Sequence, residues 1–499
     1  MFMYTDYTQH LLDNVKKIHF IGCGGSGMYP LIQILSAKGY DISGSDVLDG
    51  SIIRSEREMG VKVTLGHSAD NVVGADLVVY SAAIAKDNVE LNAAASYGIT
   101  TVERSVLLGY VSRLYKESIC VSGTHGKTTT TYLLKAILEQ ELGAKVGLIG
   151  TIQNMIGDRV LHTERTTPES FELQKLLREM ADAGCTHVVM EVSSHALMLD
   201  RVYGIPFAVG IYTNLSRDHL DFHKTMEAYC DAKALLMRQC DVGIYNADDP
   251  WAERLMADAT CPRRFSYSVN GQADLMAKNV ALEPGSVDFD AEADTEWCHV
   301  HVGIPALFTV YNTLDAMACC WNLGVPLAEC ANALAKNHGV KGRMEIIPTP
   351  GTGYTVLNDY AHKPDALEKV LQSAKAFAKG RVVALFGCGG DRDKTKRPEM
   401  AQIAVKYATT AILTSDNPRH EDPDAILDDM VAGLAPGDRY LRIADRAEAI
   451  RTAAMLAKPG DILLLAGKGH ETYQIVGDVK NHFDDKEEAL RAFALYAKN

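Results

Sequence analysis

Short apolar, β-branched runs alternate along the chain with longer stretches in which apolar residues recur at helical spacing. This alternation is typical of α/β proteins built around parallel sheets. Near the beginning, residues 17–22, 41–46 and 76–81 are expected strands, and a glycine turn leads into an expected helix over about 27–38. The pattern therefore predicts a first strand–helix unit.

A second strand–helix series begins near residue 117. Its expected strands are 118–123, 187–192, 207–214 and 242–247. Residues 265–310 are polar and alternate at strand spacing, which favours an antiparallel β insert.

A third series runs from about residue 344 to the end, with expected strands at 382–387, 411–415 and 461–467. No low-complexity linker separates the series, so boundaries are drawn where each one restarts. These restarts predict three α/β domains, at 1–114, 115–342 and 343–499.

Composition narrows the class of protein. The chain has 499 residues, of which 47% are hydrophobic and 23% charged, which excludes a disordered or coiled-coil chain. The net charge of −14 disfavours nucleic acid and anionic membranes as partners. No apolar run reaches the roughly 18 residues of a membrane span, and the N-terminus does not resemble a signal peptide. Because the 11 cysteines form no C-x-x-C pairs, we expect reduced core thiols in a cytoplasmic protein.

The first glycine turn fits the pattern G-x-G-x-x-G between a strand and a helix. Asp46 ends the second strand about 20 residues later, where an acid that binds a ribose would lie. Such a turn lets a backbone approach a pyrophosphate at a helix N-terminus. A nucleotide diphosphate is the predicted ligand, whereas a tight turn without a ligand is the structural alternative. The candidate residues are Gly22, Gly24, Gly25, Ser26, Gly27 and Asp46.

A second phosphate-type loop, G-T-H-G-K-T-T-T, follows the strand near residue 118. Val121 replaces the first glycine of the usual P-loop pattern, but Gly-Lys-Thr at a strand–helix junction favours phosphate binding. Lys127 would reach the terminal phosphates of ATP, and Thr128 would bind Mg²⁺. Glu191, at the end of a strand in the same unit, is placed to hold that metal, and His219 is a further candidate ligand.

The third series also carries four polar motifs, of which the last three directly follow its expected strands. They are N-D-Y-A-H at 358–362, G-C-G-G-D-R-D-K at 387–394, D-N-P-R at 416–419 and G-K-G-H-E at 467–471. Open α/β sheets bind ligands at the carboxyl ends of their strands. Each loop alone could be an ordinary polar turn, but three that carry Arg, Lys and Glu predict a second binding site.

Together these motifs resemble the Mur ligase family, the ATP-dependent amide-forming enzymes of peptidoglycan precursor synthesis. From about residue 132 the blocks T-T-P-E-S, E-V-S-S-H-A-L, N-L-S-R-D-H-L-D-F-H and D-N-P-R resemble the members that add meso-diaminopimelate to UDP-N-acetylmuramoyl-L-alanyl-D-glutamate. Residues 17 to about 131, with G-C-G-G-S-G-M and G-T-H-G-K-T-T-T-T, instead resemble the members that add L-alanine to UDP-N-acetylmuramate.

The resemblance implies a Rossmann-like domain that binds UDP, a central P-loop ATPase domain and a Rossmann-like domain that binds the amino acid. It implies an acyl-phosphate intermediate, ATP and Mg²⁺ as cofactors, and small-molecule substrates for what we expect to be a monomer. Lys127, Glu191, His219 and a carbamylated Lys233 would be catalytic, and with Thr128 the last three would serve the metal. The implied ATP contacts are Gly123, Thr124, His125, Gly126, Lys127, Thr128, Thr129, Asn312, Arg343 and Asp359.

For the UDP-linked substrate, the implied contacts beyond the glycine turn are Thr166, Thr167, Ser193 and Arg201. For the amino acid they are Arg392, Asp416, Asn417, Pro418, Arg419, Gly467 and Glu471. Arg419 and Arg392 would receive the distal carboxylate of meso-diaminopimelate, and Glu471 and Gly467 its ammonium end. The chain departs from the family at three positions, where Leu199, Thr309 and Lys363 replace the usual glutamine, asparagine and threonine.

Three other interpretations stay open on the sequence. An NAD-dependent oxidoreductase would use the first glycine turn but leaves the P-loop unexplained. A non-catalytic protein derived from a ligase is disfavoured because Lys127, Glu191, His219 and Lys233 are all retained. An L-alanine ligase, or a ligase of the same family for another amino acid, is the nearest alternative.

Overall fold

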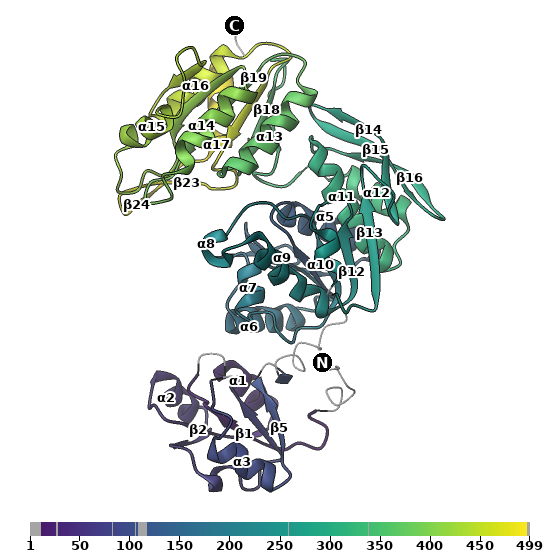
Figure 1. The fold of residues 1–499 in the computed structure, drawn as a ribbon, viewed down its shortest axis with the longest axis vertical. Helices are drawn as coiled ribbons and strands as arrows, with labels where there is room; N and C mark the ends of the chain where they lie inside the picture. The colour runs from purple at the N-terminus through teal and green to yellow at the C-terminus, as the bar shows by residue number, and fades with distance from the viewer. Residues whose placement is uncertain are drawn as a thin grey trace.

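A computed structural model describes residues 11–25, 28–81, 83–104, 106–107, 117–257, 259–337 and 339–496. Within them lie three separate sheets and a two-stranded hairpin. Figure 1 shows the three sheets with their helices as successive units, from the purple first unit through the central unit to the yellow-green third unit. The predicted α/β class with parallel sheets is confirmed.

The first unit contains a parallel five-stranded sheet in the order β3-β2-β1-β4-β5. All three predicted strands are present, and two further strands, β3 and β5, lie at the edges. Its elements are β1 (Lys17–Ile21), α1 (Tyr29–Ala37), β2 (Asp41–Asp46), α2 (Ser51–Glu58), β3 (Lys62–Leu65), a 3₁₀ turn (Ala69–Val72), β4 (Leu77–Tyr80), α3 (Val89–Ser96) and β5 (Thr100–Glu103).

The central unit contains an eleven-stranded sheet in the order β16-β15-β14-β13-β12-β11-β6-β10-β7-β8-β9. Its strands are β6 (Glu117–Ser122), β7 (Val146–Ile149), β8 (Asn154–Ile156), β9 (Arg159–Leu161), β10 (His187–Glu191), β11 (Phe207–Tyr212), β12 (Cys240–Asn246), β13 (Arg263–Ser268), β14 (Leu275–Glu283), β15 (Ser286–Ala293) and β16 (Trp297–Val302). The middle of the sheet is parallel and both ends are antiparallel.

The helices of the central unit cover both faces of this sheet. They are α5 (Lys127–Leu142), α6 (Ser170–Asp182), α7 (Ser194–Met198), α8 (Leu220–His223), α9 (Met226–Ala234), a 3₁₀ turn (Leu235–Arg238), α10 (Ala252–Ala257), α11 (Leu307–Asn322) and α12 (Leu327–Ala335). The antiparallel insert expected at 265–310 is smaller than predicted. β13 pairs in parallel with β12, and the segment from Leu307 is helical, because its apolar residues recur at helical spacing.

The third unit contains a six-stranded sheet in the order β17-β18-β22-β19-β20-β21, in which only the edge strand β17 is antiparallel. Its elements are β17 (Glu345–Ile347), β18 (Thr355–Asp359), α13 (Pro364–Phe377), β19 (Val382–Cys388), α14 (Lys396–Tyr407), β20 (Thr410–Ser415), α15 (Pro423–Val431), β21 (Tyr440–Arg442), α16 (Arg446–Leu456), β22 (Ile462–Ala466), the hairpin β23 (Tyr473–Val476) and β24 (Val479–His482), and α17 (Asp485–Tyr496).

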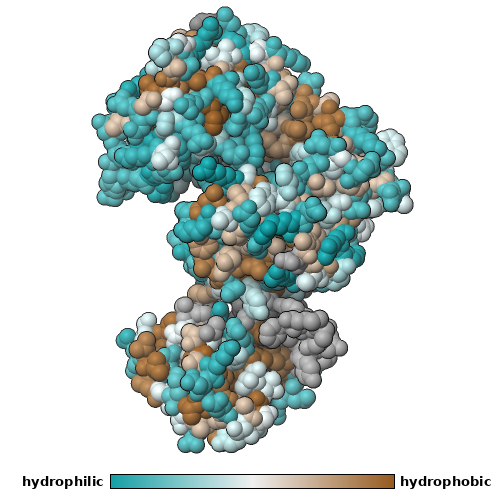
Figure 2. Space-filling view, viewed as in Figure 1, coloured by the Kyte–Doolittle hydropathy of each residue, from teal (hydrophilic) through white to brown (hydrophobic). Residues whose placement is uncertain are grey.

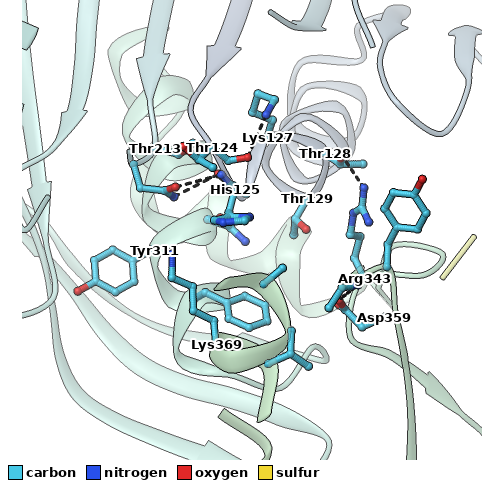
Figure 3. Close-up of a pocket in the computed structure, with 18 of the residues that line it drawn as sticks. Thr124, His125, Lys127, Thr128, Thr129, Thr213, Tyr311, Arg343, Asp359 and Lys369 are labelled. Carbon is cyan, nitrogen blue, oxygen red and sulfur yellow. Dashed lines mark hydrogen bonds between the residues drawn. The ribbon is translucent and has the colours of Figure 1, made fainter. Parts of the chain in front are cut away.

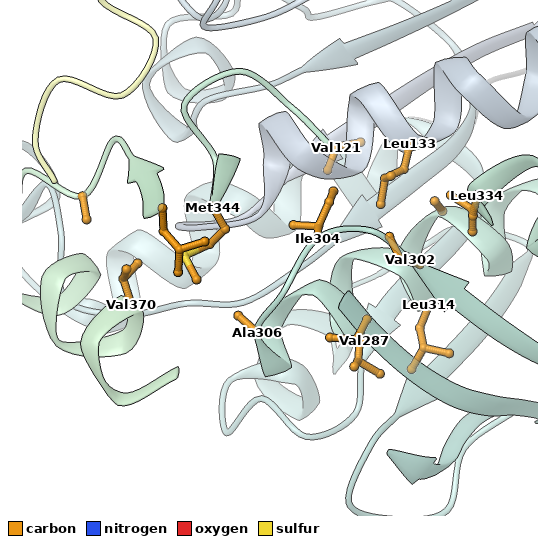
Figure 4. Packing of buried hydrophobic residues seen from close by; sticks show 14 of the residues in the cluster. Val121, Leu133, Val287, Val302, Ile304, Ala306, Leu314, Leu334, Met344 and Val370 are labelled. Carbon is orange, nitrogen blue, oxygen red and sulfur yellow. The ribbon is translucent and has the colours of Figure 1, made fainter. Parts of the chain in front are cut away.

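One apolar cluster continues from the central unit into the third. It contains Val121 and Leu133 beside the P-loop, Ala306 before α11, and Met344 and Val370 from the third unit. Figure 4 shows Met344 and Val370 at the left of the cluster, with Ala306 to their right. Burial of apolar side chains stabilises such a contact at roughly 25 cal/mol per Å². The packing holds the third unit against the mouth of the P-loop.

All 11 cysteines lie within the described residues, are buried and form no disulfide. Among the described helices, none is both long and apolar enough to cross a membrane.

Candidate active site

A cavity of about 760 Å³ lies where the central unit meets the third unit. Figure 2 shows the surface hollowed between these two units. The N-terminus of α5, the ends of β10 and β11, and α11 form the central side, and β18 and α13 form the other (Figure 3). Every predicted ATP contact except Gly123 lines this cavity, together with Thr166, Glu191 and His219.

The P-loop is closely packed on its outer side. Gly123 has φ 156°, and a Cβ there would lie 1.8 Å from Thr213 Oγ1. Gly126 has φ 89°, and a Cβ there would lie 2.4 Å from Asn312 Oδ1. Only glycine fits at either place without displacing its neighbour. The predicted nucleotide contact Asn312 thus lies directly against the turn into α5.

Two cations converge on one carbonyl of this loop. Lys127 Nζ and Lys233 Nζ donate to Gly123 O at 2.9 and 2.8 Å. Burial lowers the pKa of both ammonium groups, and for Lys233 the nearby Lys127 charge lowers the pKa further. The Lys233 ammonium also lies 4.8 Å from the centre of the Tyr229 ring. Lys233 is 1% exposed, which excludes the solvated mid-helix position usual for lysine.

Glu191 stands at the carboxyl end of β10 and is 1% exposed. Its Oε1 accepts from Thr151 N at 2.8 Å and its Oε2 from Thr151 Oγ1 at 2.9 Å. Thr151 Oγ1 also lies 3.0 Å from Thr166 Oγ1. Both carboxylate oxygens are therefore oriented by one threonine, and the cavity lies in front of them.

The predicted contacts for the UDP-linked substrate in the central unit lie around the same strand end. Thr167 Oγ1 donates to Glu191 O at 2.9 Å and accepts from Ser193 N at 3.0 Å. Arg201 donates to Thr167 O at 3.2 Å and pairs with Glu169 at 2.6 Å. These residues, separated in sequence, form one polar cluster next to Glu191.

His219 begins α8 in the left-handed conformation, with φ 53°. Burial lowers its pKa to about 4, although the Asp218 carboxylate 3.3 Å away opposes that shift. The ring is therefore neutral near pH 7 and can act as a metal ligand. Burial would raise the pKa of Asp218, but Lys363, with Nζ 2.7 and 2.8 Å from its two oxygens, holds it below its usual value.

Contacts from the third unit also reach the P-loop itself. His125 Nε2 lies 2.7 Å from Asp365 Oδ2, and Asp365 also accepts from Ser216 Oγ at 2.7 Å. Arg343 Nη2 donates to Thr128 Oγ1 at 3.3 Å, and Asp359 Oδ2 accepts from Met344 N at 2.8 Å. The third unit is thus attached to both ends of the phosphate loop.

An apolar slot extends the cavity away from the phosphate loop. Leu307, Phe308 and Tyr311 of α11 line one side, and Ala366 and Val370 of α13 line the other. Aromatic and aliphatic walls of this kind bind the faces of planar rings. This part of the cavity lining is thus more apolar than the part around the phosphate loop.

A second cluster lies at the strand ends of the third unit. A Cβ on Gly389 would lie 3.0 Å from Arg419 Nη1 and 3.7 Å from Arg392 Cγ, so both predicted arginines flank that glycine. Arg419 Nη1 donates to Gly390 O at 2.8 Å. A Cβ on Gly467 would lie 2.9 Å from Asp416 Oδ2. Separate loops thus bring the Arg419 guanidinium, the side-chain stem of Arg392 and an acid to one sheet edge, and Arg392 Nη1 donates to Asp391 O at 3.0 Å.

Glu471 and Asn417 complete this cluster. Asn417 Nδ2 donates to Glu471 Oε2 at 3.0 Å, and the same oxygen accepts from Lys468 Nζ at 3.2 Å. Tyr360 Oη lies 3.5 Å from the other oxygen, Oε1. The cluster therefore contains carboxylate groups as well as cations, which suits a ligand with charged groups of both signs.

The glycine turn of the first unit is organised by Asp46. Asp46 Oδ2 accepts from Gly24 N at 2.9 Å and Oδ1 accepts from Leu48 N at 3.0 Å. Gly22 has φ 78°, and Gly25 N donates to Gly22 O at 3.2 Å, which closes the turn. Ser26 and Gly27, the remaining predicted contacts, lie outside the described residues.

Four residues in or beside the cavity and the second cluster were not predicted from the sequence. Asp365 reads as an ordinary acidic residue in the first turn of α13, and Thr151 stands in a loop without a motif. Lys468 lies inside a motif but carried no predicted role. Lys363 was marked only as a departure from the family. Only Lys363 had a sequence signal, because a cation replaces the usual threonine there.

The metal donors do not form a complete cage. Among the described residues, no group of three or more His, Cys, Asp and Glu side chains converges as metal ligands. Mg²⁺ commonly takes one or two carboxylates and completes its shell with water and phosphate oxygens. The oriented carboxylate of Glu191 and the Thr128 hydroxyl, which line the same cavity, are donors that fit this mode.

The P-loop lies in the central unit and the cluster of mixed charge in the third, and one cavity lies between the two units. These are features expected of a ligase, an enzyme that couples a nucleoside triphosphate to the joining of two molecules. Comparison with known proteins agrees. Residues 17–116 match "Mur ligase family, catalytic domain", residues 121–320 match "Mur ligase middle domain", and residues 342–469 match "Mur ligase, glutamate ligase domain".

Named relatives give the same result. The chain is 48% identical over 370 residues to a UDP-N-acetylmuramoyl-L-alanyl-D-glutamate--2,6-diaminopimelate ligase of Clostridium acetobutylicum, covering 74% of this chain and 76% of the relative. It is 40% identical over 476 residues to the ligase of the same name from Lactiplantibacillus plantarum, covering 93% and 92%. A solved structure with that name is 32% identical, with a TM-score of 0.64 over 92% of this chain and 93% of the other.

The chain therefore belongs to the Mur ligase family. It is an ATP-dependent, ADP-forming ligase.

Proposed function

We propose that this enzyme joins meso-diaminopimelate to UDP-N-acetylmuramoyl-L-alanyl-D-glutamate in peptidoglycan precursor synthesis. The observation that carries the proposal is the pair of arginines, Arg392 and Arg419, that flank Gly389. Arginine side chains can pair with the second carboxylate of an amino acid such as meso-diaminopimelate, whereas alanine has no second carboxylate. The names of the relatives support the same substrates.

The reaction would proceed through an acyl phosphate. The γ-phosphoryl group of ATP moves to the glutamate side-chain carboxylate, which releases ADP. The amine nitrogen then attacks the acyl carbon, the C–O bond to phosphate breaks, and the nitrogen loses a proton. Lys127 would neutralise charge on the moving phosphoryl group, and Mg²⁺ held by Thr128, Glu191 and His219 would supply further charge stabilisation.

Lys233 would act as a carbamate and so complete the metal site. Carbamylation needs the neutral amine, because the lone pair of Nζ attacks the carbon of CO₂ and a proton is released. Burial and the Lys127 charge favour that neutral form, since both lower the pKa of Lys233. The product is an anion with two oxygens in place of a cation, which suits a position beside a magnesium ion.

The first unit would bind the UDP moiety through its glycine turn, and residues 1–114, 115–342 and 343–499 would be the three domains. Thr166, Thr167, Ser193 and Arg201 would contact the muramoyl dipeptide. We propose that the protein acts as a monomer in the cytoplasm.

Phosphate release tests the proposal directly. The native enzyme, with ATP and Mg²⁺, is expected to release phosphate only when UDP-N-acetylmuramoyl-L-alanyl-D-glutamate and meso-diaminopimelate are both present. Parallel reactions would use UDP-N-acetylmuramate with L-alanine, and the dipeptide substrate with L-lysine. Equal or faster turnover with L-alanine would overturn the substrate assignment, and equal use of L-lysine would overturn the amino-acid assignment.

A further inference from the structure

A lysine with no exposed surface lies beneath the cluster at the strand ends of the third unit. Lys468 follows β22 in the loop G-K-G-H-E and is 0% exposed. Gly467 and Gly469 have φ 108° and 52°, and a Cβ on Gly469 would lie 2.7 Å from Tyr360 Cβ. These glycines let the loop turn the lysine inward, away from solvent.

The buried ammonium has specific polar partners. Lys468 Nζ donates to Glu471 Oε2 and to Asn417 Oδ1, both at 3.2 Å, and lies 5.6 Å from the centre of the Tyr473 ring. Removing an ammonium group from water is costly unless it is paired and hydrogen-bonded. An apolar side chain of similar volume could fill the space at lower cost. The presence of a lysine at this buried position is thus better explained by its hydrogen bonds to Glu471 and Asn417 than by packing.

Glu471 and Asn417 are the groups that the proposed function assigns to the amino acid. Glu471 Oε2 accepts hydrogen bonds from Lys468 and from Asn417. The other oxygen, Oε1, has only the distant hydroxyl of Tyr360 near it among the contacts described. Lys468 thereby fixes the carboxylate orientation and compensates its charge. With that charge compensated, Arg392 and Arg419 are opposed only by Asp416 among the residues assigned to the amino acid. The cluster then carries a net positive charge.

We propose that Lys468 is a specificity-determining positioning residue of the amino-acid site. It orients Glu471 and Asn417 toward the amino acid, and it cancels the Glu471 charge so that the site favours a diamino acid with two carboxylates over one with a single carboxylate. The inference rests on the proposed function. Near pH 7, meso-diaminopimelate has no net charge whereas L-lysine is a cation, so a net positive site disfavours L-lysine.

The first test is Lys468→Met, which keeps the volume and removes the charge. The KM for meso-diaminopimelate is expected to rise at least tenfold and its kcat/KM advantage over L-lysine to fall at least tenfold, with the KM for ATP unchanged.

Lys480→Met is a matched control. Lys480 Nζ lies 3.6 Å from the centre of the same Tyr473 ring, but the residue is exposed. Its removal takes a lysine from that ring while leaving Lys468 paired with Glu471. Unchanged selectivity and an unchanged KM for meso-diaminopimelate are expected for this variant.

A double variant, Lys468→Met with Glu471→Gln, separates a charge effect from a packing effect. Glutamine needs no counter-ion, so the double variant is expected to be no worse than Glu471→Gln alone. This comparison also serves if Lys468→Met alone fails to fold. Simple addition of the two losses would overturn the inference, as would native selectivity in Lys468→Met. Failure of the native enzyme to use meso-diaminopimelate would instead overturn the proposed function.

Discussion

The two glycine turns of this chain follow the same local rule, a strand that ends in glycine and enters a helix, yet they are built differently. In the first unit, Gly22 N and Cys23 N donate to Ser45 O at 2.8 and 3.1 Å, and Asp46 fixes Gly24. All of these partners come from the neighbouring strand β2 and the loop after it. The described residues of this turn thus take these contacts from within their own unit.

The P-loop of the central unit depends on elements far away in sequence. Thr124 N donates to Asn214 O at 2.9 Å, and His125 N donates to Asn214 Oδ1 at 3.0 Å. His125 also pairs with Asp365 of the third unit. The described contacts of the first turn thus stay within one unit, whereas those of the P-loop join segments of the central and third units.

The largest expected effect is that of Lys127→Ala. This change removes the cation that we propose faces the phosphates, and loss of one strong electrostatic contact commonly costs about 10²–10³-fold in kcat. ADP formation is expected to fall at least by that factor, while calorimetry should show unchanged affinity for the UDP-linked substrate. A parallel loss of that affinity would contradict the independence of the two turns.

Lys233→Ala is expected to lower kcat by about 10²-fold, an effect of the size that loss of one positioned charge produces. The lysine reaches the P-loop through Gly123 O, so only the ATP half-reaction should suffer. Short carboxylates are expected to restore part of the rate, because they can replace the carbamate oxygens. Mass spectrometry of the native protein under CO₂ should show the added mass. Full turnover by the variant at limiting Mg²⁺ would exclude the carbamate role.

A matched pair of glycine substitutions compares the turns directly. Gly126→Ala places a methyl group 2.4 Å from Asn312 Oδ1 at φ 89°, whereas Gly24→Ala meets Asp46 and Ile53 at 3.0 Å without a positive φ. Strain of about 1–3 kcal/mol at the first site corresponds to roughly a 5- to 150-fold rise in the KM for ATP. Gly24→Ala should raise only the KM for the UDP-linked substrate, by less than tenfold. Steady-state kinetics with each substrate varied in turn would test this. A raised KM for ATP in Gly24→Ala, or a raised KM for the UDP-linked substrate in Gly126→Ala, would contradict the prediction.

The sequence was sufficient for the parts of the fold and site that depend on local patterns. Buried strands such as β19 and β22, the P-loop and the loop that carries Arg419 all follow from apolar runs and the residues at their ends. Contacts between distant segments could not be predicted in this way. The pairing of Lys363 with Asp218 across two units depends on how the third unit packs, which no local pattern records. The fold class is confirmed by the structure, and the roles of the site residues stay predictions.

The smallest expected effect is that of Asp46→Asn in the first glycine turn. The carboxylate accepts one backbone N–H at each oxygen, from Gly24 and from Leu48. An amide has one oxygen and one NH₂ group, so one of these two N–H groups loses its acceptor and faces a donor. A typical hydrogen bond contributes about 0.5–1.5 kcal/mol, which corresponds to roughly a 2- to 12-fold rise in the KM for the UDP-linked substrate.

Asp49→Asn is the control, because Asp49 pairs with Arg57 at 3.1 Å on the exposed surface and holds no part of the turn. The KM for ATP should be unchanged in both variants, since no contact described for Asp46 reaches the P-loop. Since Asp46 already holds two backbone groups, its role is to shape the turn. Neither variant should therefore bind NAD more tightly than it binds the UDP-linked substrate. A rise in the KM for ATP as large as that for the UDP-linked substrate would show that the first turn is coupled to the ATP cavity.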